Sequence, residues 1–224
     1  MTAHETDGTA QPDPTADLLP PVAQFVRTVR KYISEGHADI ALWSRVARDL
    51  ETLLADPALK ERAKSWPDTK RGNDAPSNLL FYEDPNYGFV LNALVKTPGA
   101  VTSVHDHGQS WTLYGVLEGG EYIERFARTD DNPTFEGPAV LQPDGTFDVT
   151  PGYIDVVPPW QIHRETNGDH RTIGFIVRSQ RSGTFRQCYY DRENGDVTEY
   201  RGPSQIPFAL ASAAFRGRIR TDQA

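Results

Sequence analysis

The N-terminal part of the chain carries apolar residues at helical spacing. From Pro21 to Gly36 they recur every three or four positions, which predicts an amphipathic helix that ends at the glycine. The same pattern predicts a second helix over about 39–54 and a shorter one over 57–63. Residues 1–20 are rich in Thr, Ala, Pro, Asp and Gly and hold little to bury, so we predict a disordered leader there. The helices carry no metal-ligand spacing, and packing is their expected role.

After a polar segment the apolar period shortens to two, which predicts β-structure. Turn-forming pairs such as Asn167-Gly168 and Asn194-Gly195 separate the apolar runs. Many short strands at close spacing are typical of an antiparallel barrel or jelly roll. The predicted strands are 79–82, 88–95, 101–107, 111–117, 121–127, 145–149, 153–157, 161–166, 172–178, 186–190 and 197–200. The expected units are the leader (1–20), N-terminal helices packed on the barrel (21–66), the barrel (67–205) and a C-terminal tail (206–224) with a short helix over 207–216.

Composition and charge limit the possible partners. The 224 residues suffice for one domain with a substantial core, and the formal net charge is -8. Surfaces that bind nucleic acid or anionic membranes carry clustered Lys and Arg, so we expect neither partner. The single cysteine, Cys188, excludes an intrachain disulfide and a multi-cysteine metal cluster. The first residues lack the pattern of a secretory signal, and no apolar run approaches the roughly 18 residues of a membrane span, so we expect a cytoplasmic protein.

Two histidines one residue apart, His105 and His107, are the main chemical signal. Residues two apart on a β-strand point to the same face, so the pair can chelate one metal. An isolated pair of this kind also arises by accident on a surface or in a core. A third histidine, His163, follows a turn-rich run far along the chain. Two ligands from one strand and one from a distant strand cover one face of a metal and leave other positions open, as a catalytic site requires.

The surroundings of these histidines resemble the two sequence motifs of the cupin superfamily. The matching segments are Gly99-x5-His105-x-His107 and Gly152-x5-Pro158-x2-Gln161-x-His163-x3-Asn167. Trp160 stands in the second motif where a glycine is usual. The resemblance implies a mainly β fold, the cupin double-stranded β-helix (jelly-roll barrel) with a helical N-terminal portion. It also implies that His105, His107 and His163 are the metal ligands.

The first motif departs from the cupin pattern at one ligand. Cupins normally supply a carboxylate four or five residues after the second histidine, and Trp111 and Thr112 occupy those positions. Glu118 falls in the following turn, so the expected ligand set is three neutral histidines without a carboxylate. Within the cupins this set is typical of thiol dioxygenases.

Further segments are similar to the cysteine dioxygenase family and its bacterial 3-mercaptopropionate-oxidising relatives. They are His-Asp-His with an aromatic residue soon after, an apolar run ending in Gly-Gly-Glu, and Pro-x-x-x-His-Arg-x-x-Asn. The resemblance covers about residues 21–205. It implies an Fe(II) cofactor, with O2 and a small thiol as substrates and a sulfinate as product.

The substrate-recognition residues of that family are not all present. Its Ser-x-His-x-Tyr run would fall on Ile176, Arg178 and Gln180, and its carboxylate-binding arginine would fall on Asn78. Asn78 and Arg178 are therefore candidates for binding the substrate, although Arg178 also fits a solvated strand residue. Trp111 and Trp160 are candidate pocket walls, and aromatic residues are also common in barrel cores. No side chain is assigned a catalytic role, and Asp106 is expected to point away from the metal and to act as a hydrogen-bond acceptor.

The leading hypothesis is a non-haem iron(II) dioxygenase that oxidises a small thiol, such as a mercapto acid, to a sulfinate. The alternative keeps the metal and changes the chemistry to an oxygenase, lyase or isomerase for a non-thiol small molecule. The missing Ser-His-Tyr run motivates that alternative. A third hypothesis is a non-enzymatic cupin that binds a small ligand or acts as a sensor.

Overall fold

The computed structural model describes residues 13–130 and 138–210. Residues 1–12 of the predicted leader lie outside the described residues, whereas Thr15 is buried and accepts a hydrogen bond from Arg27. The described helices are α1 (Pro20–Ser34), α2 (Asp39–Ala55) and α3 (Pro57–Ala63). The described strands are β1 (Ser77–Glu83), β2 (Val90–Lys96), β3 (Thr112–Glu118), β4 (Glu121–Arg128), β5 (Leu141–Val149), β6 (Ile154–Val157), β7 (Ile162–Asn167), β8 (Thr172–Arg178), β9 (Gln187–Tyr190), β10 (Val197–Tyr200) and β11 (Ser204–Pro207).

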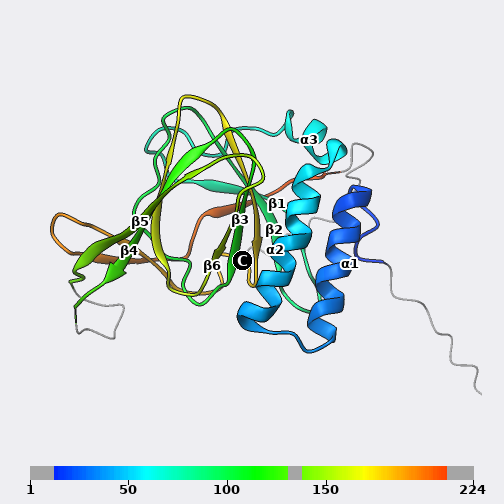
Figure 1. The fold of residues 1–224 in the computed structure, drawn as a ribbon, viewed down its shortest axis with the longest axis horizontal. Coiled ribbons are helices and arrows are strands. Elements are labelled where there is room, and N and C mark those ends of the chain that lie inside the picture. The colour runs from blue at the N-terminus through cyan, green and yellow to red at the C-terminus, as the bar shows by residue number, and fades with distance from the viewer. Residues whose placement is uncertain (1–12, 131–137, 211–224) are drawn as a thin grey trace, which may run out of the picture.

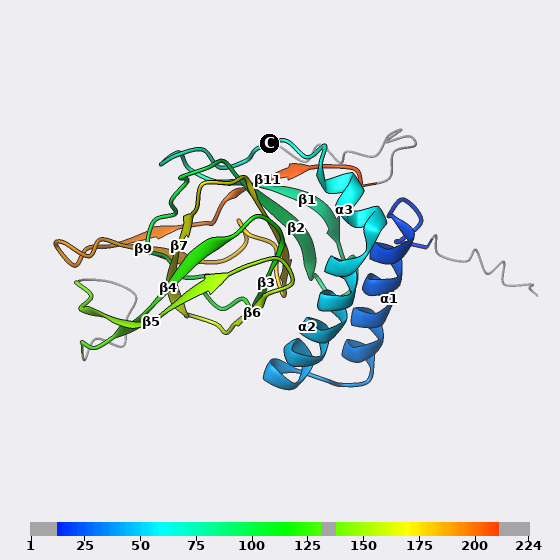
Figure 2. The same ribbon diagram turned by 45° about the horizontal axis from the view of Figure 1, so that its top comes forward.

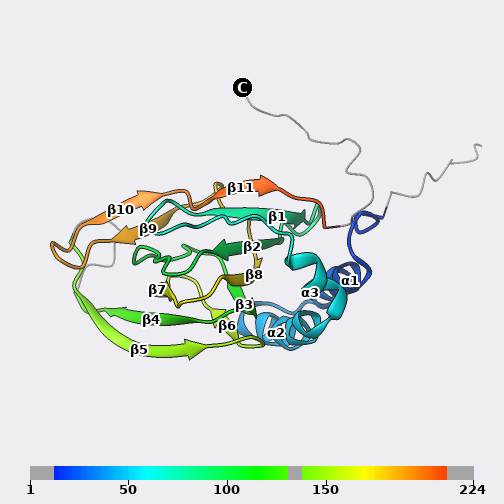
Figure 3. The same cartoon turned by 90° about the horizontal axis from the view of Figure 1, so that it is seen from above.

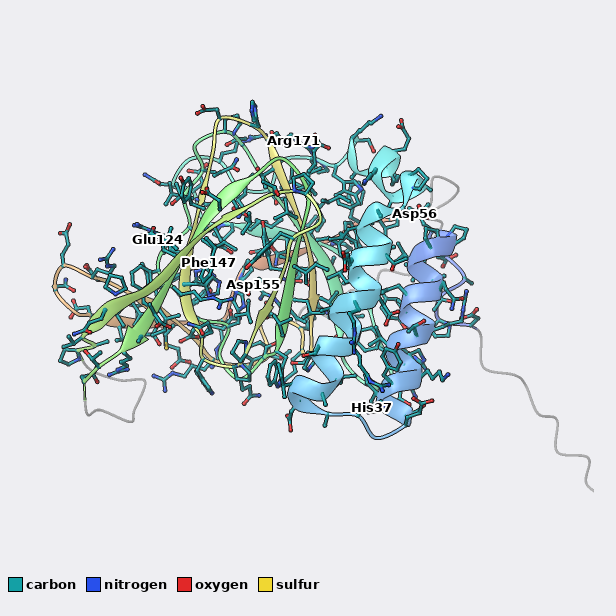
Figure 4. The ribbon with its side chains drawn as sticks, viewed as in Figure 1. His37, Asp56, Glu124, Phe147, Asp155 and Arg171 are labelled. Atoms are coloured by element: carbon teal, nitrogen blue, oxygen red, sulfur yellow. The ribbon has the colours of Figure 1, made fainter. Side chains whose placement is uncertain are left out.

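The three predicted helices are confirmed, and their ends follow from local chemistry. Gly36 follows the last turn of α1 with φ of 81°, a conformation that glycine adopts without strain. The Asp56 carboxylate caps α3 by accepting hydrogen bonds from the backbone N–H groups of Ala58 and Leu59. Figure 4 shows Asp56 on the helical side of the molecule. Among the described residues, no helix is both long and apolar enough to cross a membrane.

The strands form the walls of a barrel. One sheet has the order β11-β1-β2-β8-β3-β6, a second the order β5-β4-β7, and a third pairs β10 with β9. Figure 3 shows β11, β1 and β2 on one side of the barrel, with β4 and β5 on the other. The predicted architecture is confirmed: the chain is mainly β, a barrel of mostly antiparallel strands with a helical N-terminal portion.

The predicted strand over 101–107 is wrong. In that segment Val101 and His105 make only isolated bridges, His105 with both His163 and Tyr189. The chain turns after His105 because the Asp106 carboxylate accepts a hydrogen bond from the N–H of Gly108, whose φ is 55°. The two histidines therefore lie on an irregular loop that runs antiparallel alongside β7.

The C-terminal tail also differs from its prediction. Ser204–Pro207 forms β11 and pairs in parallel with β1, so residue 207 belongs to a strand. The next three residues, 208–210, are not helical either. The rest of the predicted helix, 211–216, lies outside the described residues.

The helices pack on the outer face of the six-stranded sheet. Figures 1 and 2 show α1 and α2 side by side along one side of the barrel. Leu50 of α2 belongs to the same apolar cluster as Leu113 of β3 and Phe175 of β8. The adjacent residues Tyr114 and Ile176 belong to a second cluster, because neighbouring residues of a strand face opposite ways. This alternation leaves the inner face of β3 and β8 free to line a cavity.

Candidate metal centre

The structure brings the three predicted ligands together. His105, His107 and His163 each offer a ring nitrogen, and these atoms lie within 4.8 Å of one another. All three side chains are buried. The His105–His163 pairing is fixed by two backbone hydrogen bonds of 2.9 Å, one in each direction. The loop and β7 are therefore held in register at the histidines themselves.

Hydrogen bonds orient the rings of His105 and His163 so that the same nitrogen of each remains available. Nδ1 of His105 lies 2.8 Å from the Ser103 carbonyl oxygen, and Nδ1 of His163 lies 3.1 Å from that of Gln161. A carbonyl only accepts, so each Nδ1 carries the proton and each Nε2 keeps a lone pair. Nε2 of His107 lies 3.5 Å from the Arg178 guanidinium, which only donates. Three imidazole nitrogens within 4.8 Å of one another fit a divalent transition metal.

Electrostatics keep the rings of His107 and His163 neutral at physiological pH. Burial lowers the pKa of His163 to about 4, and the proximity of His105 adds to the effect. Burial and the nearby Arg178 charge hold the pKa of His107 well below its ordinary value. A neutral imidazole is the form that binds a metal, so little proton release is needed before binding.

Asp106 acts as the predicted hydrogen-bond acceptor, and its carboxylate does not point toward the three histidines. Its carboxylate accepts hydrogen bonds from the N–H of Gly108, the N–H of Cys188 and the hydroxyl of Tyr190. The residue is fully buried. It therefore ties the histidine loop to β9, on the side away from the cavity.

A cavity of about 220 Å³ opens beside the histidines. Asn78 and Arg178 line it, and both are buried. Burial lowers the pKa of Arg178 from its ordinary value, and an arginine guanidinium stays protonated in proteins. The interpretation of Arg178 as a solvated strand residue is therefore wrong. The structure places both candidate substrate-binding residues where a small ligand would reach them.

The two tryptophans predicted as pocket walls are not among the residues that line this cavity. Trp111 packs against the cluster between helices and sheet, because Thr112 takes the cavity-facing position of the alternating pattern. Trp160 lies in the turn between β6 and β7, with φ of 65°. That left-handed conformation explains why glycine is usual at this place in the motif.

The sequence analysis missed a carboxylate, Glu165, that lines the same cavity. Its Oε1 lies 3.8 Å from Nε2 of His163, and its Oε2 accepts a 2.6 Å hydrogen bond from the Thr102 hydroxyl. Residues two apart on a strand share a face, so its spacing from His163 on β7 was the available signal. The group of side chains able to share one ion contains the three expected histidines and no carboxylate, so Glu165 lies beside this group and not in it.

Glu165 is held in its charged form by its neighbours. Burial alone would raise its pKa, but the Lys96 charge and the hydrogen bond from Thr102 lower the pKa of Glu165 below its usual range. Lys96 itself donates a hydrogen bond to Glu121, which also accepts one from the Tyr114 hydroxyl. A buried charged network therefore lies behind the histidines, inside the barrel.

The comparisons with known proteins concern the fold. No known family profile matches the sequence. An uncharacterized conserved protein with a double-stranded beta-helix domain from Klebsiella pneumoniae is 14% identical over 64% of this chain and 89% of that one, with a TM-score of 0.40. The cupin domain of Schizosaccharomyces pombe Cnp3 is 13% identical over 46% and 64%, with a TM-score of 0.34. An oxalate oxidase is 17% identical over 42% of each chain, with a TM-score of 0.33.

The chain spans about half the length or less of some of the solved structures that it matches, such as the oxalate oxidase. The fold and the side chains together define the class of site: a buried three-histidine cluster inside a β-barrel, which could hold a metal ion.

Proposed function

We propose that the protein is an iron(II)-dependent dioxygenase that oxidises a small thiol bearing an acid group, such as a mercapto acid, to a sulfinate. One observation carries the proposal. Three neutral histidines form a compact group beside the buried Arg178 guanidinium, for which the described residues provide no carboxylate partner. The reaction adds both atoms of O2 to the sulfur, which is oxidised as O2 is reduced, and the thiol proton is released.

The charges around the cavity favour an anionic substrate. Neutral imidazoles leave the charge of a divalent metal uncompensated, and Arg178 adds a further positive charge. Glu165 offsets only part of this total. A thiolate that also carries a carboxylate would balance the remaining charge, whereas a neutral molecule would leave it buried and unpaired at high cost.

Two cavity-lining donors lack a hydrogen-bond acceptor among the described residues. They are Nδ2 of Asn78 and Nε of Arg178. A buried donor without an acceptor costs about 1–3 kcal/mol, and a carboxylate on the substrate would remove that cost. Their role would be to hold the acid group and so to orient the sulfur toward the histidines. A bound iron(II) ion would supply the redox chemistry and lower the pKa of the thiol.

Oxygen consumption by the iron-loaded protein tests this proposal. The panel is 3-mercaptopropionate, cysteine, mercaptosuccinate and cysteamine, with the sulfinate product measured separately. We expect uptake with at least one thiol acid, and slower uptake with cysteamine because it has no carboxylate. His163→Ala serves as the control without a complete ligand set. Absence of uptake with every thiol would overturn the thiol part of the proposal.

A second candidate function is supported by a specific observation. Ile176 and Arg178 line the cavity where the family's Ser-x-His-x-Tyr run would begin, and Gln180 instead contacts Gln109. This difference favours a metal-dependent cupin that acts on a non-thiol small molecule. Turnover that is independent of O2, or activity with manganese, nickel or zinc, would support it. In either case the acidic net charge favours a small molecule as the binding partner over nucleic acid or a membrane surface. A cytoplasmic location is part of the proposal.

A further inference from the structure

Lys70 places a second positive charge at the cavity beside the histidines. Its side chain lines this cavity, and the residue is only 2% exposed. Lysine is almost never buried to this extent unless a carboxylate pairs with it, and the neighbouring Lys96 follows that rule by pairing with Glu121. Lys70 instead donates to the backbone carbonyls of Gly72 and Asp74, at 2.7 and 2.6 Å, and forms no ion pair with a carboxylate of the described residues.

The Lys70 ammonium keeps one N–H for a ligand. An ammonium has three N–H donors, and the two carbonyl groups use two of them. Carbonyl oxygens satisfy hydrogen bonds but carry no net charge, so the buried positive charge stays uncompensated at a cost in free energy. Burial is the main influence on this group and lowers the pKa of Lys70. An anion in the cavity would supply both the missing acceptor and the missing charge.

Lys70 and Arg178 reach the cavity from opposite ends of strand β2. Lys70 makes a bridge to Lys96, the last residue of β2, whereas Arg178 pairs with Val90, the first residue of that strand. Both side chains nevertheless line the same cavity. An acid group bound at Arg178 therefore leaves Lys70 for a different group of the same ligand.

The buried charges at the cavity carry an excess of positive charge. Arg178 and Lys70 are opposed by one buried carboxylate that lines the cavity, Glu165. Asp74 also lines it, but this residue is exposed, and solvent screens its charge. A divalent metal ion at the histidines would add two further positive charges. A thiolate with one carboxylate leaves part of this excess uncompensated, whereas a thiolate with two carboxylates balances it.

We propose that Lys70 binds a second acid group of the substrate, so that the substrate is a di-acid. One carboxylate would lie at Arg178 and the other at Lys70. The inference rests on the proposed function for the use of this cavity as the substrate site, but it does not depend on the thiol. Mercaptosuccinate has this chemistry, whereas 3-mercaptopropionate has a single carboxylate and cysteine carries an ammonium in place of the second one.

Calorimetric titration with succinate and butyrate provides the test, because these acids have similar length and differ by one carboxylate. The full chain is loaded with iron(II) under anaerobic conditions. We expect succinate to bind about 10- to 100-fold more tightly than butyrate, as a hydrogen bond to a charged group implies. Lys70→Met keeps the apolar stem and removes the ammonium. It should weaken succinate binding by about the same factor and leave butyrate binding nearly unchanged, whereas Lys70→Arg should keep most of the preference.

Lys64→Met is the matched control. Lys64 is exposed, pairs with Glu61 and does not line the cavity, so the same chemical change there should leave both affinities unchanged. Circular dichroism verifies that the variants fold. A crystal structure of the wild type with succinate gives a test that needs no variant. In it a carboxylate oxygen should lie within about 3.2 Å of Lys70 Nζ.

Each other outcome contradicts the inference in a different way. Equal weakening of both acids by Lys70→Met would show that Lys70 only holds the segment 72–74 in place. A preference for succinate that survives in Lys70→Met would place the second carboxylate elsewhere, for example at the metal. Equal affinity of the wild type for both acids would also overturn the inference.

Two results separate this inference from the proposed function. Absence of binding of either acid to the wild type would overturn both the di-acid inference and the acid-binding role of the cavity. Succinate binding that depends on Lys70, together with no oxygen uptake with any thiol, would overturn the thiol chemistry and leave the di-acid inference intact.

Discussion

At the scale of single residues, Asp106 fixes the loop that carries two of the three histidines. Its carboxylate accepts hydrogen bonds from the N–H groups of Gly108 and Cys188 and from the Tyr190 hydroxyl. Because His105 and His107 flank it in sequence, any movement of Asp106 moves both rings. In a regular strand the alternation of side chains would orient the two rings. In this loop the hydrogen bonds of Asp106 orient them instead.

Replacing Asp106 with alanine should therefore weaken both the fold and the metal site. Each buried donor left without its acceptor costs about 1–3 kcal/mol, so the midpoint of thermal unfolding should fall by several degrees or more. Metal affinity should fall about 10- to 100-fold, as for other residues that orient ligands. Tyr190→Phe removes the hydroxyl donor together with its hydrogen bond to Asp106. It should have a smaller effect on both the unfolding midpoint and the metal affinity. Equal cobalt affinity of Asp106→Ala and wild type would contradict this role.

Arg178 should determine the preference for acid substrates. A hydrogen bond to a charged group contributes about 1.5–3 kcal/mol, so Arg178→Gln should raise KM for thiol acids by about 10- to 100-fold. KM for cysteamine, which has no carboxylate, should change much less. Steady-state oxygen consumption with both kinds of thiol measures the difference. A similar rise for cysteamine would show that Arg178 supports the site as a whole.

The histidine ligands were predictable from the sequence because their spacing falls inside two ordered motifs. Arg178 was predictable as a candidate, but its burial was not, because alternation alone does not say which face of β8 is inside. Glu165 could have been found by extending the rule of alternation from His163. Asp106 was predicted as an acceptor, whereas its partner Tyr190 on β9 depends on a contact between distant segments.

At the scale of elements, Asp84 joins helix α1 to the turn between β1 and β2. Its carboxylate accepts hydrogen bonds from Arg30 of α1, from the Tyr82 hydroxyl and from the N–H groups of Asn86 and Tyr87. Burial alone would raise the pKa of Asp84, but these hydrogen bonds lower it below its usual value of 3.8. The ionised form is therefore favoured by folding.

This contact predicts a particular dependence of stability on pH. Because the folded-state pKa of Asp84 is lowered, its contribution is fully present above the unfolded-state pKa of about 3.9 and is lost as pH falls below it. Asp84→Asn should reduce the free energy of unfolding at pH 7 by about 1–3 kcal/mol. The gap in the free energy of unfolding between variant and wild type should narrow from pH 5 to pH 3, as measured by urea unfolding. A gap that stays constant over this range would contradict the assignment.

Most elements could be predicted from apolar spacing, and the exceptions have physical reasons. The segment 101–107 has strand-like composition, yet Asp106 turns the chain through side-chain hydrogen bonds that no local periodicity records. The segment 204–207 is short and largely polar, and it becomes a strand because the open edge of β1 provides its partners. Both outcomes depend on contacts between residues far apart in sequence.

At the scale of the whole molecule, the helices cover an apolar sheet face. Leu91, Leu113 and Phe175 on that face are fully buried, in one cluster with residues of α1 and α2. Figure 4 shows Glu124 and Phe147 in the barrel part of the molecule, away from these helices. The barrel is therefore not expected to fold without the N-terminal helices, because removing them would expose a continuous apolar surface.

A truncated chain that begins at residue 67 tests this dependence. We expect low soluble yield and no cooperative unfolding transition, in contrast to the full chain. The single substitution Leu50→Ala disturbs the same contact between helices and sheet to a smaller extent. It should lower the free energy of unfolding by about 2–5 kcal/mol without changing cobalt affinity. A truncated chain that unfolds cooperatively and binds cobalt like the full chain would contradict the account.

The central claim is that His105, His107 and His163 bind one metal ion. Its most direct test is the metal content of the purified chain after loading with iron(II) under anaerobic conditions and removal of free metal. We predict one ion per chain for the wild type and almost none for His107→Ala and His163→Ala, both verified as folded. Equal metal content in the wild type and the folded histidine variants would contradict the claim.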